Sequence, residues 1–256
     1  MNPHSPGTRI VIGVSVASVL AMTLLPAIPQ DPSYHAFADR RSVAGIPNFL
    51  DVSSNILLLA SGLWGMFSLR RGACFFLSDR EKIPYLMFFV GVALTGPGSA
   101  WYHLAPGNFG LFWDRLPMAV AFMALLAAVI NERISDTAGK IMLPPLVSFG
   151  IFSVIFWYLG ELTGRGDLRF YAFAQFYPML AIPLLLVLFP PRYSRQEDFG
   201  VVFVWYLLAK LCEVLDSRIY GLGGVVSGHT LKHLFAAAAV FTLVRMLARR
   251  RPARTP

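Results

Sequence analysis

Long apolar segments, separated by short polar or charged breaks, run along the whole chain of 256 residues. A helix needs about 20 mostly apolar residues to cross a bilayer. Stretches rich in Pro, Gly or charge separate the segments that reach this length. The predicted spans are residues 10–28, 47–69, 83–104, 112–131, 140–160, 168–190, 199–218 and 227–247. Because the alternating pattern of barrel strands is absent, the sequence predicts an all-α, polytopic membrane helical bundle.

Composition supports a membrane location. Hydrophobic residues make up 56% of the chain and charged residues only 14%, whereas a soluble domain carries about 25% charged residues. The net charge of +8 raises the question of a nucleic-acid partner, but no nucleic-acid-binding motif accompanies it. We attribute the charge to basic loops that face the cytoplasm.

The distribution of Lys and Arg among the loops predicts the orientation. The loops on one side hold Arg9, Arg70, Arg71, Arg80, Lys82, Arg133, Lys140, Arg192, Arg195, Arg245, Arg249, Arg250, Arg251 and Arg254. The loops on the other side hold only Arg40, Arg41, Arg165, Arg169 and Arg218. The richer side is expected to be cytoplasmic, with both termini inside. We expect a bacterial inner-membrane protein whose site lies towards the periplasm.

Three parts of the chain are distinguished. Residues 1–30 are expected to form an extra N-terminal transmembrane helix, residues 31–250 a seven-helix domain, and residues 251–256 a basic tail. The first segment also has the features of a signal peptide, because an apolar stretch follows Arg9. Its exit reads LLPAIPQD, which lacks a small-x-small cleavage site, so we favour a retained helix.

Three histidines within the predicted spans have the pattern of a metal site. His229 and His233 are four residues apart in SGHTLKHLF, so they share one helix face. His103 follows Ser99 by the same step in GPGSAWYHL, and Asp114 follows in LFWDRLPM. Ionisable groups inside a bilayer are costly and usually mark function.

The predicted topology brings these and other polar residues to one membrane depth. They lie at the outer ends of five spans, where Asp51, Ser54 and Asn55 begin the second span and Glu213 and Asp216 end the seventh. Nothing in the composition requires this coincidence. It is the main argument for a single site.

Three imidazoles can hold Zn²⁺ and leave a fourth position for water. A carboxylate beside the metal can orient that water or take its proton, which is the role we expect for Asp114. Ser99 is placed to donate a hydrogen bond to a developing oxyanion. These parts describe metal-assisted hydrolysis of an amide or ester in a membrane lipid. Other transition metals also suit the same ligands.

Each residue also has a structural explanation. Asp114 and Arg115 could form an interfacial ion pair, and Ser99 could be a small residue at a helix contact. One predicted helix face carries three charged residues at steps of three, Lys210, Glu213 and Asp216. This spacing favours a buried stripe of ion pairs over a set of residues that surrounds the metal ligands. His35 lies in an outer loop that could reach the site, and His4 lies in the N-terminal tail.

The motifs resemble those of the alkaline ceramidase family, which belongs to the seven-helix membrane hydrolases related to adiponectin-receptor-like proteins. That family has Ser and His four apart, then Asp-x-Leu-Pro-Met, then a late His-x-x-x-His. Here GPGSAWYHL, DRLPM and HTLKH follow in that order, and NFLDVSSNILLL resembles the first core helix. The resemblance covers roughly residues 34 to 247.

The resemblance implies a ceramidase-like hydrolase domain in which His103, His229 and His233 bind zinc. Asp114 would then position water, with Ser99 beside it. The implied reaction cleaves the amide bond of ceramide-type lipids to a sphingoid base and a fatty acid. We expect a hydrophobic tunnel for the acyl chains, lined by Phe and Leu of residues 177–189.

The chain departs from the family in two places. Relatives bind Ca²⁺ through an acidic stretch before the first core helix. Here Asp39, Asn48 and Asp51 are the available oxygen ligands, but glutamates are missing and Arg40 and Arg41 oppose a cation, which argues against calcium. The Glu that usually follows the catalytic Asp is replaced by Arg115, a change expected to alter the entrance or the preferred headgroup.

Two other functions remain open from the sequence. The first is a zinc-dependent lipid esterase or phospholipase, because the same chemistry serves both bonds. The second is a receptor or transporter with a structural metal. Transporters often carry internal repeats and broken helices; no repeat is visible, although the Gly-Pro-Gly of GVALTGPGSAWYH could break a helix.

Overall fold

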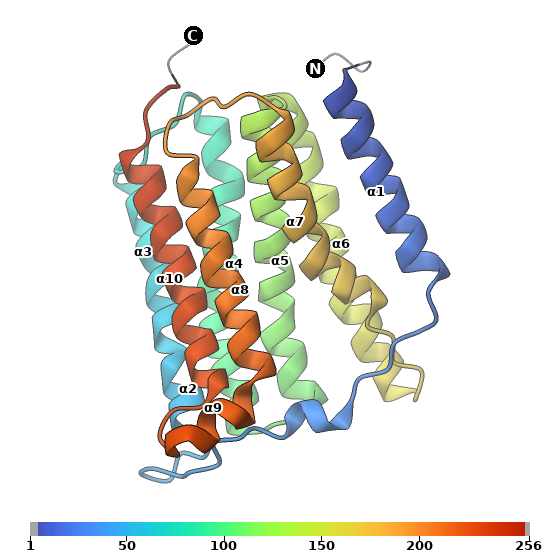
Figure 1. The fold of residues 1–256 in the computed structure, drawn as a ribbon, viewed down its shortest axis with the longest axis vertical. Coiled ribbons are helices and arrows are strands. Elements are labelled where there is room, and N and C mark those ends of the chain that lie inside the picture. Colours follow the sequence, from blue (N-terminus) through green and yellow to red (C-terminus); the bar gives the residue numbers. More distant parts are fainter. Residues whose placement is uncertain (1–4, 254–256) are drawn as a thin grey trace.

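The computed structural model describes residues 5–253, which form a bundle of helices without a β-strand in that range (Figure 1). The predicted tail with His4, and the last three residues of the predicted basic tail, lie outside the described residues. The helices are α1 (Pro6–Leu24), α2 (Phe49–Ser54), α3 (Ile56–Arg70), α4 (Lys82–Leu104), α5 (Asn108–Arg133), α6 (Asp136–Leu162), α7 (Arg169–Leu188), α8 (Glu197–Val214), α9 (Asp216–Gly223) and α10 (Gly228–Arg249). The predicted all-α membrane bundle is therefore confirmed. Two 3₁₀ turns, η1 (Pro32–His35) and η2 (Asp79–Glu81), precede α2 and α4.

Seven helical segments of the described chain are long and apolar enough to cross a membrane. They are α1, α2 with α3, η2 with α4, and then α5, α6, α7 and α10. The predicted span at 199–218 differs, because its helix α8 carries Glu197, Asp198, Lys210 and Glu213. That helix nevertheless packs along α10 within the bundle. The protein is thus a polytopic membrane bundle in which one core helix is unusually charged.

α5 occupies the centre of the bundle and packs against α4, α6 and α7. Its buried face is rich in alanine, and small residues let membrane helices approach closely. The α4–α5 contact shows this at Gly91, where an added Cβ would lie 2.9 Å from the backbone nitrogen of Ala121. The Gly-Pro-Gly sequence around Pro97 does not interrupt α4. A broken helix, the feature that favoured a transporter, is therefore not found there.

The extra helix α1 lies at the edge of the bundle and packs against α7 (Figure 1). The Ser15 hydroxyl is 2.6 Å from the hydroxyl of Tyr177 in α7. Most of the other side chains of α1 are exposed in the isolated chain, as expected for a helix surrounded by lipid. α1 is thus an addition to a core built from the later helices.

Two predicted spans break near the same end of the bundle. The second span divides into α2 and α3 at Asn55, and α8 ends before α9 at Leu215. Figure 1 shows α2, α9 and the start of α10 together at this end, while α1 begins and α10 ends at the opposite end. These breaks bring polar helix termini together beside the start of α10.

Candidate metal centre

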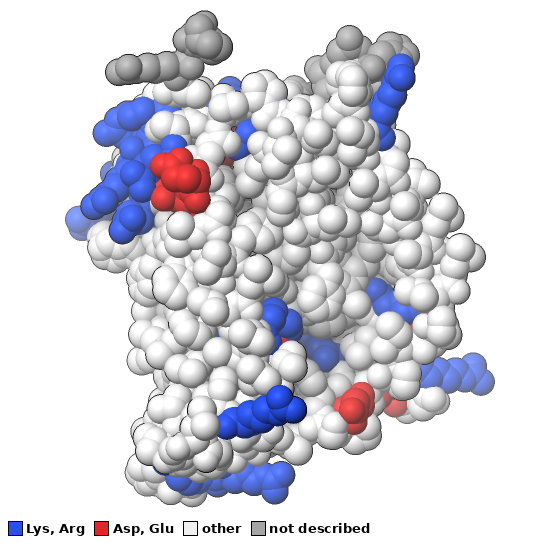
Figure 2. Space-filling view, viewed as in Figure 1, with Lys and Arg blue, Asp and Glu red and all other residues white. Residues whose placement is uncertain are grey.

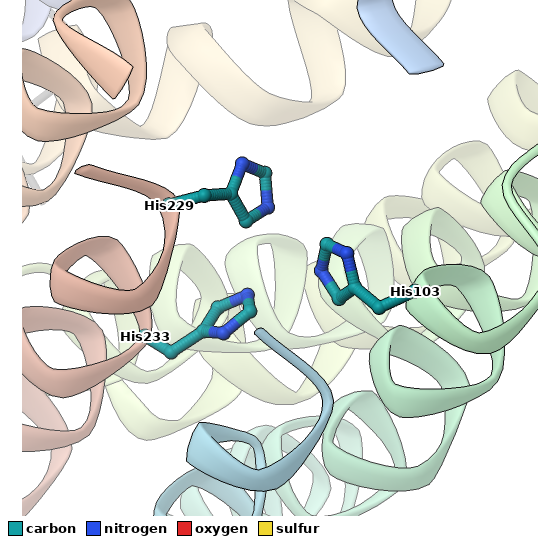
Figure 3. A group of neighbouring side chains, drawn as sticks. All are labelled: His103, His229 and His233. Carbon is teal, nitrogen blue, oxygen red and sulfur yellow. The ribbon is translucent and has the colours of Figure 1, made fainter. Parts of the chain in front are cut away.

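The three predicted histidines converge at this end of the bundle. His103 lies in the last turn of α4, and His229 and His233 lie in the first two turns of α10 (Figure 3). The ring centroid of His103 is 4.6 Å from that of His229 and 5.1 Å from that of His233, and the two α10 rings are also 5.1 Å apart. Figure 3 shows the rings facing a common space.

The ring nitrogens that face this space lack partners. Among the described residues, Nε2 of His229, Nε2 of His233 and both nitrogens of His103 are buried without a hydrogen bond. A buried polar atom without a partner costs about 1–3 kcal/mol. One nitrogen from each ring lies within 4.8 Å of the others, so the group could hold a metal ion. Three imidazoles are a suitable donor set for zinc and for several other transition metals.

A serine of α2 fixes the orientation of His233. Ser54 Oγ is 2.8 Å from Nδ1 of His233, and the same hydroxyl donates to the carbonyl oxygen of Asp51 at 3.2 Å. Metal-binding histidines commonly use the second ring nitrogen in this way, which fixes the tautomer and the ring angle. With Nδ1 occupied, the Nε2 lone pair of His233 is left to face the common space.

The N-terminus of α10 is held by two carboxylates. Asp51 Oδ1 accepts hydrogen bonds from the hydroxyls of Ser227 (2.8 Å) and Thr230 (2.6 Å). Asp216 Oδ1 accepts from the backbone N–H of His229 at 2.8 Å. Negative charge at a helix N-terminus is favourable because of the helix dipole. These contacts fix the turn that carries His229 and therefore the position of its ring.

Gly228 allows α10 to start close to the preceding helices. An added Cβ at this position would lie 2.7 Å from Cα of Asp216 and would also collide with the carbonyl oxygen of Cys212. Both neighbours belong to the backbone, so neither can move aside as a flexible side chain would. The glycine immediately before His229 is thus required by the close approach of α8 and α9.

The predicted oxygen ligands for calcium each have another partner. Asp39 accepts two hydrogen bonds from the guanidinium of Arg41, at 2.8 and 2.7 Å, and this interaction holds the pKa of Asp39 below its ordinary value. Asn48 donates its amide to the carbonyl oxygen of His103 at 2.8 Å. Asp51 anchors α10 as described. Asn48 and Asp51 thus support segments that carry the histidines, a role that their sequence positions did not indicate.

The predicted stripe of Lys210, Glu213 and Asp216 is only partly correct. Glu213 forms ion pairs with Lys210 and, at 2.9 Å, with Lys232 of α10. Asp216 does not continue this stripe, because the helix breaks at Leu215 and Asp216 begins α9. The two acids also differ with respect to the less favoured alternative, a shell around the metal: Asp216 contacts the backbone of His229, whereas Glu213 contacts Lys232.

A large cavity extends from His233 into the bundle. It contains about 1290 Å³ of empty space, including its open mouth, and Ser99, Asp114 and His233 line its polar end. The remainder is mostly apolar and is lined by side chains of α4, α5, α7, α8 and α10. Of residues 177–189, which were expected to form the tunnel, only Met179 and Ile182 contribute, so the predicted Phe and Leu lining is wrong.

The cavity lies where two neighbouring helices stand apart. Within residues 5–253, no Cα atom of α7 comes within 8 Å of one in α8, although both helices line the cavity. Figure 2 shows a hollow in this face of the molecule, with basic atoms recessed inside a broad uncharged band. A side opening at the level of the bilayer would admit a ligand directly from the lipid phase.

Asp114 and Ser99 share this cavity but do not contact the histidines by hydrogen bonds. Asp114 lies in the first two turns of α5 and Ser99 one turn before His103 in α4, and both are buried. No hydrogen bond within residues 5–253 joins either of them to the trio. The two residues are thus linked to the trio through the cavity that they line together with His233.

Two loop residues and one lysine complete the surroundings. Phe37 covers the site, with its ring 4.5 Å from that of His103 and 4.9 Å from that of His229. His35 does not join the trio; it bonds to Tyr102 at 2.9 Å and Asn108 at 3.0 Å. Lys232 lines the cavity. In the sequence, the charge of Lys232 directly before His233 was an indication that this residue belongs to the site. No sequence feature indicated that Phe37 lies beside the histidines.

No protein family, curated protein or solved structure matches this chain. The resemblance of its motifs to those of alkaline ceramidases therefore depends on the residues quoted above. What the geometry itself establishes is a buried three-histidine group that could bind a metal ion, with His233 lining a mostly apolar cavity in a membrane bundle.

Proposed function

We propose that this protein is a zinc-dependent intramembrane lipid amidase that hydrolyses the N-acyl bond of ceramide-type lipids. The observation that carries the proposal is a group of three buried imidazoles with unpaired nitrogens, one of which, His233, lines a cavity whose wall is mostly apolar. Reaction centres for lipids need this combination, because the acyl chain must stay in an apolar environment while the scissile bond reaches polar groups.

The residues divide the chemical work between them. His103, His229 and His233 would hold the metal, which when bound supplies Lewis acidity and activates water for attack. Asp114 would take the proton of the attacking water and pass it to the leaving nitrogen, since it lines the same cavity. Ser99 would donate its O–H to the oxygen of the polarised carbonyl. Ser54 would keep the His233 ring in the orientation that metal binding needs.

The metal part is tested by measuring zinc per molecule in purified protein. We expect about one zinc per wild-type chain, since one group of three ligands is present in the described residues, and strong loss in His229→Ala and in His233→Ala. His35→Ala is the matched control, because its ring lies in the neighbouring loop and bonds to Tyr102 instead. Unchanged zinc in both α10 variants would end the proposal.

The reaction is tested with labelled ceramide and with ester lipids of the same acyl length. Wild type is expected to release fatty acid from ceramide. Asp114→Asn is expected to lose about 10²–10⁴-fold in turnover while keeping its zinc. Faster cleavage of the ester lipids would identify an esterase instead, and bound zinc without cleavage of any lipid would indicate a structural metal.

A further inference from the structure

The guanidinium of Arg115 lines the same cavity as His233 and is buried without an acidic partner in the described chain. Its residue is only 5% exposed, and Nη1 has no hydrogen-bond partner among the described residues. No ion pair within residues 5–253 includes it. Asp114 is its neighbour in sequence, but successive residues of a helix point in different directions. The ion pair that the sequence suggested for Asp114 and Arg115 is therefore not formed.

Three aromatic rings surround this guanidinium. Its Cζ atom lies 4.4 Å from the ring centroid of Trp157, 4.7 Å from that of Tyr171 and 5.4 Å from that of Tyr34. Ring faces attract a cation and hold it in one position, but they do not accept the in-plane N–H groups at its edge. A guanidinium has five N–H donors, so a caged arginine still needs acceptors.

The cavity contains more positive than negative side chains. Besides one histidine and the tyrosines, its ionisable lining residues are Asp114, Arg115, Lys210, Glu213 and Lys232. Both lysines are paired with the single carboxylate of Glu213. With Asp114 counted as negative, one positive charge remains uncompensated, and a divalent metal would increase the excess. Buried charge without a counterion is costly, so this arrangement favours an anionic ligand.

We infer that Arg115 binds an oxyanion, a carboxylate or phosphate, on the polar half of the lipid that occupies the cavity. The preferred substrates would then be ceramide-type acyl amides that carry an anionic headgroup. A guanidinium matches carboxylate and phosphate oxygens through paired N–H groups. The reaction part of this inference rests on the proposed function. The anion-binding part does not, because it needs only Arg115 and the apolar cavity.

Binding is tested with hexadecyl phosphate and hexadecanol, which share the alkyl chain and differ in the anion. Wild-type protein in nanodiscs of zwitterionic lipid is expected to bind the phosphate at least tenfold more tightly. Arg115→Gln is expected to remove that preference and Arg115→Lys to retain part of it. Arg70→Gln is the matched control, because Arg70 is exposed in the last turn of α3. Binding of inorganic phosphate is measured as well, to distinguish a lipid headgroup from a free anion. If inorganic phosphate binds as tightly as hexadecyl phosphate, the assignment of a lipid ligand is overturned.

Turnover is tested with N-palmitoylglycine and N-palmitoylethanolamine, which carry a carboxylate and a hydroxyl at the same place. We expect kcat/KM to favour the carboxylate in wild type and the preference to disappear in Arg115→Gln with zinc content unchanged. Equal turnover of the two by wild type would overturn the inference and leave the hydrolase proposal intact. Cleavage of neither lipid and of no ceramide, with Arg115-dependent binding of hexadecyl phosphate, would remove the hydrolase proposal and leave the anion site.

A folding measurement separates a binding role from a structural one. An arginine retained to stabilise the bundle would lower the unfolding temperature when replaced. An unpaired buried cation costs stability in the free protein, so Arg115→Gln is expected to unfold at an equal or higher temperature without ligand. Hexadecyl phosphate is then expected to stabilise wild type and not the variant. A clear loss of stability, together with unchanged phosphate preference, would contradict the assignment.

Discussion

Ser54→Ala is the substitution that most directly tests how the site is held together. It removes a hydroxyl that lies 2.8 Å from Nδ1 of His233, in a place where both residues are buried. The variant loses this bond, and the backbone of Asp51 is then the remaining hydrogen-bond partner of the His233 ring. Loss of such a partner typically weakens metal binding by about 10–100-fold, which corresponds to about 1.4–2.7 kcal/mol.

The assay is thermal or denaturant unfolding at a series of buffered zinc concentrations. At a free zinc concentration of about 100 Kd, wild type gains about 2.7 kcal/mol from the metal. A variant with about 30-fold weaker binding would gain about 0.9 kcal/mol at the same concentration, so the expected difference is about 1.8 kcal/mol. Competition with a chelator gives the two affinities independently.

The control is Ser53→Ala, one residue earlier in α2. Its hydroxyl donates at 3.4 Å to the carbonyl oxygen of Leu50 and has no bond to a histidine. We expect zinc affinity close to that of wild type. If Ser54→Ala and Ser53→Ala bind zinc equally well, the Ser54 hydroxyl does not orient a metal ligand and the reasoning is refuted.

Other outcomes follow from the same contacts. Gly228→Ala is expected to destabilise the protein by about 1–3 kcal/mol, because its Cβ would meet the backbone of Asp216; Gly221→Ala, which has open space at its Cβ, serves as control in denaturant unfolding. Asp39 has its pKa lowered chiefly by the hydrogen bond from Arg41, so its carboxylate stabilises the fold above the unfolded pKa of about 3.9. That contribution should fade as pH falls through the lowered folded value, and Asp39→Asn should flatten unfolding profiles measured there. Phe37→Ala should leave zinc content unchanged but speed zinc release to a chelator, since the ring covers two of the histidines.

The features that the sequence predicted correctly are those fixed by local spacing and by length. The position of each span follows from about 20 apolar residues in a row, and all the later helices lie within or close to the predicted ranges. His229 and His233 share a face because four residues make about one turn of helix. The helical continuity needed for that inference holds in α10. The helix is interrupted at Leu215, so Asp216 does not continue the predicted stripe of Lys210 and Glu213.

The partners of the histidines could not be predicted, because they depend on how distant helices are rotated. The bond from Ser54 to His233 joins residues 179 positions apart, and the one from Asn48 to His103 joins residues 55 apart. The cavity lining was missed for a related reason. A helix in a membrane is apolar on all faces, so its sequence gives little indication of which face lines a cavity and which meets lipid.

The buried polar atoms around the trio argue together for ligands. Besides the unpaired histidine nitrogens, Oδ2 of Asp51, Oδ1 of Asn55 and Nη1 of Arg115 are buried without a hydrogen bond in the described chain. Native proteins leave few such groups unpaired, because each costs stability. Apolar residues of similar size would fill these positions at lower cost, so stability of the free bundle does not explain them. The proposed cation at the imidazoles and the proposed anion at the arginine would supply the missing partners of the histidine nitrogens and of Arg115.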